Sequence, residues 1–185
     1  DPQQEVAGIG ALLGRAESAL QAQRLDGSDD SALPLFQQVL ARAPNHLRAL
    51  EGREDALSDL LQQARDAAAQ GDVAGAAARV QRARDFDAGH VDLPASEAAL
   101  NPALEARVRD GQRLLRRQRW QSAGDAFQAV LAVRPEDAVA QRGLQQVIEA
   151  LLAAATRQAA DFRFDLAAQA LATAQKVGAS GPQVA

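Results

Sequence analysis

Residues 111–135 have the sequence GQRLLRRQRWQSAGDAFQAVLAVRP, from which the structural class of the chain can be inferred. Its pattern predicts a helix, a tight turn near Trp120 and a second helix that ends before Pro135, because proline does not fit inside a helix. Small residues at Gly111 and Ala123 would let the two helices approach closely, with the large side chains of Trp120 and Phe127 filling the space around them. The sequence therefore predicts a helical hairpin with Trp120 and Phe127 in its core.

The same arrangement occurs four times along the chain. Each copy has an apolar residue in the turn, a small residue in the second helix and an apolar residue four positions later. The turn residues are Leu25, Val73, Trp120 and Phe164; the small residues are Ala32, Ala76, Ala123 and Ala167; the apolar residues that follow are Phe36, Val80, Phe127 and Leu171. No single hairpin can bury its apolar faces alone, so we expect the four hairpins to stack.

The four hairpins form two related pairs. The segment that begins FQQVLA at Phe36 recurs as FQAVLA at Phe127, and the same spacing of 91 residues relates Gly52 to Gly143. Leu25 and Trp120 are 95 residues apart, so the first copy has four extra residues, at 26–29. We therefore expect one domain over residues 1–185, with copies at about 6–90 and 103–178, a connector at 91–102 and a frayed tail at 179–185. In the connector, Asn101 and Pro102 are typical of a helix start.

This pattern resembles the tetratricopeptide repeat (TPR) family over nearly the whole chain, most closely at residues 111–135. The resemblance implies an all-α, right-handed stack of about four hairpins, an α-solenoid. Successive small residues lie 44, 47 and 44 positions apart, against about 34 in a standard repeat. The surplus lies in long first helices at 45–70 and 136–161. By analogy with the family, a protein or peptide partner would contact Glu17, Ser58, Arg65, Glu105, Arg109, Gln112, Arg113, Arg116 and Thr156.

Composition excludes several classes of protein. The chain has 47% hydrophobic residues, no cysteine and a net charge of −4. The missing cysteine removes disulfides and thiolate metal sites, and no apolar run is long enough to cross a membrane. Acidity argues against nucleic-acid binding. We expect no catalytic residue, cofactor or metal: His46 and His90 stand alone at helix boundaries, where capping or solvent exposure accounts for them.

Charged strips have two interpretations. Arg109, Arg113 and Arg116 follow i, i+4, i+7 spacing and would line one helix face, either as an anion-binding strip or as a solvated face balanced by Glu105 and Asp110. A strip of the opposite charge is formed by Glu51, Asp55 and Asp59, and its simplest interpretation is again a solvent-exposed helix face. The acidic and the basic strip together would also suit head-to-tail association of two chains. The sequence does not settle the oligomeric state.

Two functions remain open from the sequence. One is a non-catalytic interaction scaffold; the other is a sensory, ligand-binding region of a transmembrane signalling protein such as a serine/threonine kinase or a secretion regulator. The segments NHLRALEG at 45–52 and GDVAGAAARVQRA at 71–83 are similar to TPR-like regions of proteobacterial envelope and signalling proteins. That similarity, with a start at Asp1-Pro2 and no methionine, leads us to expect a piece of a larger periplasmic or envelope protein, tethered through flanking sequence; the alternative is cytoplasmic.

Overall fold

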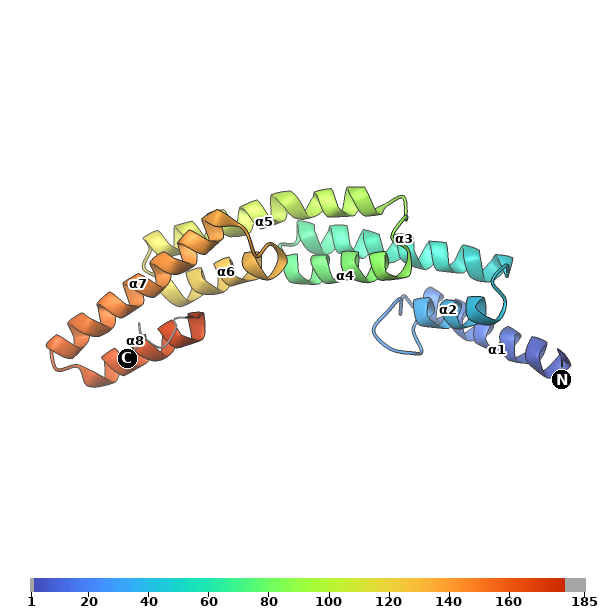
Figure 1. Ribbon diagram of the computed structural model, residues 1–185, viewed down its shortest axis with the longest axis horizontal. Helices are drawn as coiled ribbons and strands as arrows, with labels where there is room; N and C mark the ends of the chain where they lie inside the picture. The colour runs from blue at the N-terminus through green and yellow to red at the C-terminus, as the bar shows by residue number, and fades with distance from the viewer. Residues whose placement is uncertain (1, 179–185) are drawn as a thin grey trace. The chain divides into compact units, whose positions relative to one another are not determined.

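The computed structural model describes residues 2–178, and every regular element within them is an α-helix (Figure 1). The prediction of an all-α protein is therefore confirmed. The helices are α1 (Pro2–Gln21), α2 (Ala32–Arg42), α3 (Leu47–Ala69), α4 (Val73–Phe86), α5 (Leu93–Arg116), α6 (Trp120–Val133), α7 (Ala138–Ala160) and α8 (Phe164–Val177). The predicted frayed tail at 179–185 lies outside the described residues. None of these helices is both long and apolar enough to cross a membrane.

The chain divides into two compact units, which we describe separately. Unit 1 comprises Asp1–Gln70 with Gly75–Leu100, and unit 2 comprises Gly71–Ala74 with Asn101–Ala185. In unit 1, α1 packs on α2 and α2 packs on α3. In unit 2, α6 and α8 both pack on α7. In these four pairs, consecutive helices are therefore neighbours in space, as short connections between antiparallel helices require.

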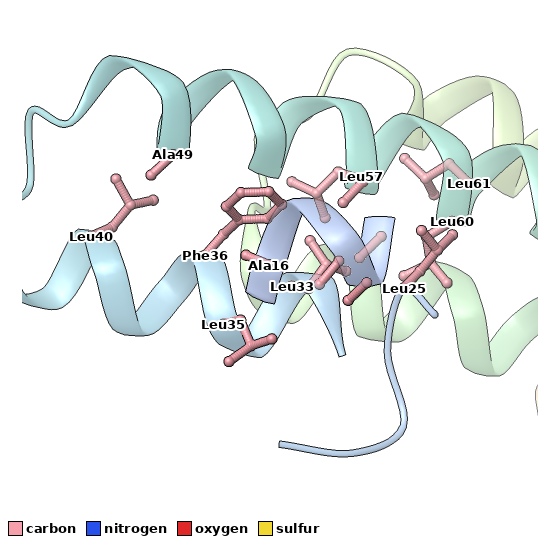
Figure 2. Close-up of a cluster of buried hydrophobic side chains, with 14 of the residues drawn as sticks. Ala16, Leu25, Leu33, Leu35, Phe36, Leu40, Ala49, Leu57, Leu60 and Leu61 are labelled. Atoms are coloured by element: carbon pink, nitrogen blue, oxygen red, sulfur yellow. The ribbon is translucent and has the colours of Figure 1, made fainter. Parts of the chain in front are cut away.

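The core of unit 1 is built around Phe36, which is fully buried. Figure 2 shows its ring pointing from α2 toward α3, with Leu33 and Leu57 beside it. A Cβ atom built on Gly52 of α3 would lie 2.5 Å from Cε1 of this ring, far inside ordinary contact distance. Only glycine fits at that position, so α2 and α3 approach closely enough for the ring to rest on the α3 backbone.

Phe127 has the same role in unit 2. Its ring is fully buried, and it rests on two glycines from different helices. A Cβ on Gly111 of α5 would meet the ring at 2.8 Å, and a Cβ on Gly143 of α7 would meet it at 2.5 Å. The prediction that Gly111 allows close approach and that Phe127 belongs to the core is confirmed. Ala123, the predicted small residue of α6, is also fully buried.

Four interhelical turns share one backbone conformation. Each contains a residue with positive φ two positions before the predicted apolar turn residue: Gln23 (56°), Gly71 (82°), Gln118 (57°) and Phe162 (58°). Where the hydrogen bonds are described, the next amide donates to a carbonyl five residues back, as Arg119 N does to Leu114 O at 2.9 Å and Arg163 N does to Gln158 O at 2.8 Å. This is the Schellman helix ending, which uses a left-handed residue to satisfy the last carbonyls.

Two of the predicted turn anchors are not buried. Leu25 and Val73 are each 3% exposed, as predicted, whereas Trp120 is only half-buried and Phe164 is 63% exposed. The prediction that Trp120 lies fully in the core was therefore wrong, as was the anchoring role given to Phe164. Within the described residues α8 is the last helix, so no following helix covers the side of α8 on which Phe164 lies.

Helix boundaries also differ from the sequence prediction. The predicted break at Asn101-Pro102 is absent, because α5 includes both residues with Pro102 in its interior. The Asn101 side chain does not cap a helix; its Oδ1 accepts a hydrogen bond from Arg134. The long helices α3 and α7 have 23 residues each, against the 26 predicted. The N-cap of α3 is His46, whose Nδ1 accepts a hydrogen bond from the amide of Ala49, so α3 begins two residues after the predicted start at 45.

Candidate functional site

The predicted arginine strip lies exposed on α5. Arg109 NH1 is 3.8 Å from Glu105 Oε2, and Arg113 forms an ion pair with Asp110. Arg116 has no ion-pair partner within the described chain. Exposed pairs of this kind contribute little to stability, roughly 0–1 kcal/mol. Two of the three arginines are therefore balanced on their own helix, which favours a solvated face for them and leaves Arg116 as the unbalanced charge.

The remaining predicted partner residues are spread over both units. In unit 1, Glu17 accepts two hydrogen bonds from Arg48, at 2.6 and 2.8 Å, and Arg65 NH1 donates to Ser96 Oγ at 2.8 Å. Ser58 is half-buried on α3. In unit 2, Gln112 lines a shallow hollow on α5 and α7, and the hydroxyl of Thr156 donates to the Leu152 carbonyl at 3.0 Å. Their role in binding stays a prediction.

Unit 1 has a polar cleft of about 610 Å³ that the sequence did not predict. One wall is the segment between α1 and α2, which contains the four extra residues of the first copy. The other walls are α3 and one face of α4. We call it the arginine cleft; its lining residues are Gln23, Arg24, Leu25, Asp26, Gly27, Ser28, Ser31, Leu60, Gln63, Gly75, Ala78, Arg79 and Arg82.

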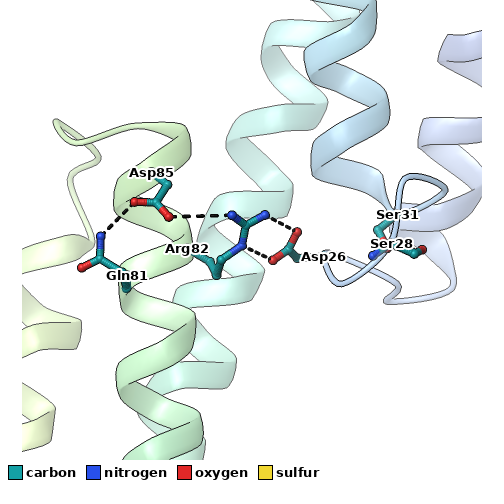
Figure 3. A network of polar contacts seen from close by, with 6 residues as sticks. All are labelled: Asp26, Ser28, Ser31, Gln81, Arg82 and Asp85. Carbon is teal, nitrogen blue, oxygen red and sulfur yellow. Dashed lines mark hydrogen bonds and ion pairs between the residues drawn. The ribbon is translucent and has the colours of Figure 1, made fainter. Parts of the chain in front are cut away.

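An ion pair joins two walls of the arginine cleft (Figure 3). Arg82 Nε donates to Asp26 Oδ2 at 2.7 Å and Arg82 NH2 donates to Asp26 Oδ1 at 3.0 Å, a bidentate arrangement. These hydrogen bonds lower the pKa of Asp26 below its usual value and raise the pKa of Arg82. The guanidinium of Arg82 also lies 5.1 Å from the centre of the Phe86 ring. The pair ties the extra segment to α4 across 56 positions of sequence.

The other two arginines of the cleft are unbalanced. Arg79 NH1 donates to the Gly75 carbonyl at 2.9 Å, and this is a neutral partner. Neither Arg24 nor Arg79 has an acidic partner among the described residues. The cleft lining thus contains three arginines and one aspartate, in a chain whose net charge is −4. Its chemistry suits an anion.

Unit 2 has a smaller cleft, about 260 Å³, made from corresponding sequence positions. Trp120 lies 95 residues after Leu25, and Leu151, Leu166, Ala170 and Thr173 lie 91 residues after Leu60, Gly75, Arg79 and Arg82. The remaining lining residues are Gln121, Gln158 and Gln169. No charged side chain lines it. Trp120 is half-buried because it forms one wall of this cleft, which we call the neutral cleft.

An exposed apolar surface lies where α7 meets α8. Phe162 is 81% exposed, Phe164 63% and Leu166 42%. The two phenylalanine rings form an edge-to-face pair, with centroids 6.1 Å apart and planes at 83°. Phe162 also has a φ of 58°, which is uncommon for a bulky residue. We call Phe162, Phe164 and Leu166 the aromatic turn.

Neither histidine belongs to a group of three or more possible metal ligands within residues 2–178. His46 caps α3, as the capping alternative predicted. His90 is buried, not solvent-exposed; its Nδ1 accepts from the Asp92 amide at 3.1 Å and its Nε2 lies 3.2 Å from Glu54 Oε1. Across the described residues, no group of three or more histidine, cysteine, aspartate or glutamate side chains could hold a metal ion.

Sequence reasoning identified the arginine strip but not the arginine cleft or the aromatic turn. One available signal was α4, where Gly75, Ala78, Arg79 and Arg82 share a helical face. Another was Phe162, which occupies the turn position that holds glutamine or glycine in the other three turns. Comparison with known proteins gives no relative: no protein-family model, no curated protein and no solved structure matches the chain.

Proposed function

We propose that this chain is a non-catalytic interaction scaffold, a duplicated pair of TPR-like helical hairpins that binds a protein or peptide partner. The observation that carries the proposal is the aromatic turn. Apolar side chains of this size are normally buried, and aromatic residues are enriched where proteins meet other proteins. Phe162 and Phe164 are two of only five phenylalanines in the chain, so leaving both exposed is a considerable loss of potential core.

The backbone of the aromatic turn strengthens this interpretation. A left-handed conformation costs a bulky L-residue roughly 1–2 kcal/mol, whereas glycine adopts it freely. Gly71 occupies the position 91 residues before Phe162. Phe162 therefore destabilises the backbone of its own turn, and its exposed ring adds nothing to the hydrophobic core. A residue that is unfavourable for its own turn and exposed to solvent suggests a role in contact with another molecule.

The duplicated architecture is supported by matching elements. Helices α3 and α7 each have 23 residues and begin 91 positions apart, and α4 and α8 each have 14 residues with the same separation. Phe36 rests on Gly52 as Phe127 rests on Gly143. Sequence spacing and side-chain packing within each unit thus support the proposal of two copies of one ancestral unit of the α-solenoid type.

The arginine strip would provide a second contact for the partner. Arg116 is exposed and unbalanced on α5, next to the pairs formed by Arg109 and Arg113. Rim charges of this type mainly set the association rate and its salt dependence. We therefore assign the strip to steering of the partner and the aromatic turn to its affinity.

We further propose that the chain is the TPR-like ectodomain or accessory region of a larger bacterial envelope protein. The resemblance of segments 45–52 and 71–83 to proteobacterial envelope proteins supports this location. The alternative function, a sensory ligand-binding region of a transmembrane signalling protein, is favoured by one observation, the unbalanced charge of the arginine cleft. A fusion of the full-length protein to a reporter that is active only in the periplasm tests the location: an intact, expressed fusion without reporter activity would exclude it.

The binding proposal is tested with a photocrosslinking residue at position 164. The crosslinker is placed in the wild-type background and in Phe162→Gly, and proteins from the source cell extract that crosslink are separated and identified. A matched control carries the crosslinker at Val91, which is 80% exposed in unit 1. We expect one saturable product from position 164, weakened by Phe162→Gly and absent from position 91. Equal, unsaturable labelling at both positions would contradict the proposal.

A further inference from the structure

We propose that the arginine cleft of unit 1 is a binding site for a carboxylate group, presented by an acidic peptide or by a small dicarboxylic acid. This inference goes beyond the proposed function, because it assigns a ligand chemistry to a second site. The aromatic turn belongs to unit 2 and the arginine cleft to unit 1, so either assignment can fail while the other stands.

The arginines of the cleft have unused hydrogen-bond donors. A guanidinium has five N–H donors and no acceptor. Arg79 uses one donor, toward the Gly75 carbonyl, although its side chain is half-buried against the cleft wall. Arg24 uses none of its side-chain donors within the described chain. The charge of Arg79, which is partly withdrawn from water and has no acidic partner, favours an anion arriving from outside. Arg24 is exposed and adds unpaired donors at the same cleft.

The corresponding helix of unit 2 forms without arginines at the two matching positions, so the charges of Arg79 and Arg82 are not required for the hairpin to fold. Ala170 and Thr173 stand 91 residues after Arg79 and Arg82, in a helix of the same length. The space differs as well: Gly75 leaves the cleft open where Leu166 narrows the neutral cleft, which has about 260 Å³ against 610 Å³. The two clefts thus share their position and differ in size and charge. Arg24 is a weaker indicator, because arginine recurs at this turn position in Arg119 and Arg163.

The ion pair already present in the cleft indicates that the anion is a carboxylate. Asp26, part of the cleft lining, already binds Arg82 through both carboxylate oxygens. Planar bidentate pairing is the geometry in which arginine and carboxylate match best. That internal pair holds the extra segment in place, and Arg79 lies on α4 less than one helical turn before Arg82. Asp26 neutralises the charge of Arg82 only, and a carboxylate from a ligand would neutralise the charge of Arg79 in the same way.

The test measures binding of a fluorescein-labelled hexaglutamate peptide with an amidated C-terminus, by fluorescence anisotropy at low ionic strength. The variant is Arg79→Ala, which introduces the residue found at position 170 and breaks no ion pair. The matched control is Arg42→Gln, which removes one positive charge from an exposed position of the same unit. Circular dichroism verifies that both variants keep wild-type helicity.

We expect Arg79→Ala to raise the Kd at least about tenfold and Arg42→Gln to change it less than about twofold, since a charge-assisted bidentate contact is lost only in the first. Unlabelled hexaglutamate and glutarate are then used as competitors. Displacement by the peptide alone identifies an acidic segment as the source, and displacement by both identifies a small dicarboxylate; either supports the carboxylate site.

Three results would overturn the inference. The first is that the wild-type protein binds none of the carboxylate probes. The second is that both variants weaken binding equally, which would show only a general effect of charge. The third is displacement of the peptide by inorganic phosphate at concentrations where neither glutarate nor unlabelled hexaglutamate competes, which assigns the cleft to a different anion. Crosslinking through position 164 is unaffected by Arg79→Ala in every case, so failure here is distinguishable from failure of the proposed function.

Discussion

Replacing Gly143 by alanine places a Cβ atom against the ring of Phe127, and the sign of its effect depends on whether that ring is present. In the wild-type protein the new Cβ would lie 2.5 Å from Cε1 and 2.6 Å from Cε2 of the ring. Ordinary contacts between carbon atoms are about 3.5–4 Å. The ring also lies close to Gly111, where a built Cβ would be 2.8 Å from Cε1, so it has little room to move away.

The magnitudes follow from this geometry. Phe127→Ala should cost about 3–5 kcal/mol, toward the upper end, because neither Gly111 nor Gly143 has a side chain that could fill the cavity. Gly143→Ala should cost about 1–3 kcal/mol from overpacking, reduced by the roughly 1 kcal/mol that alanine gains over glycine within a helix. In the Phe127→Ala background the clash is gone, and Gly143→Ala should stabilise by about 1 kcal/mol. The expected coupling energy is about 2 kcal/mol.

Urea denaturation of the four proteins in this cycle measures the coupling. Trp120 is the only tryptophan and the chain has no tyrosine, so intrinsic fluorescence reports on unit 2 directly. Circular dichroism gives an independent signal from all helices. Additive effects, with a coupling energy below about 0.5 kcal/mol, would show that the ring does not rest on Gly143 and would refute the packing described for unit 2.

Three further predictions concern single positions. Because Arg82 lowers the pKa of Asp26, the stability lost in Asp26→Asn should be about 1 kcal/mol at pH 7. This difference should begin to fall below about pH 4, where the carboxyl of the unfolded chain takes up a proton, and should vanish once the pH is below the lowered pKa of the folded state; a difference that stays constant as the pH falls through this range would contradict the ion pair. Phe162→Gly should raise the free energy of unfolding by about 0.5–1 kcal/mol in urea, because it relieves a left-handed phenylalanine; a loss of stability would mean that the ring packs on the protein. Trp120→Ala should cost about 1–2 kcal/mol by circular dichroism, less than Phe127→Ala, because Trp120 is only half-buried; a loss equal to that of Phe127→Ala would place the indole in the core.

Helices and close contacts could be predicted from the sequence because local signals determine them. Proline and glycine ended helices where expected, and the 3.6-residue period placed Phe36 and Phe127 on buried faces. The spacing of 91 residues related Gly52 to Gly143 before their contacts with the rings were known. The break at Asn101-Pro102 was predicted wrongly, because Asn101 bonds to Arg134, a partner 33 positions away that no local signal reveals.

The candidate sites depend on information that the sequence pattern does not contain. The repeat pattern predicted that Phe164 would be the buried apolar residue of the fourth turn. Burial also requires a neighbouring helix, and none in the described chain follows α8. Arg82 and Asp26 meet across 56 positions, so the charges of α4 were indistinguishable from a solvated helix face. Exposure and long-range pairing, more than helix position, decide which side chains remain free to bind.

The most direct test of the interaction proposal compares stability and binding in one variant of the aromatic turn. The double variant Phe162→Gly and Phe164→Gln is compared with the wild-type protein and with Val91→Gln, which removes an equally exposed apolar side chain from unit 1. Each protein is measured for its urea midpoint and for the amount of the crosslink-identified partner that it retains on a column. We expect the double variant to be at least as stable as the wild type and to lose the partner, and we expect Val91→Gln to retain it. Undiminished retention by a stable double variant would refute a role for the aromatic turn in binding.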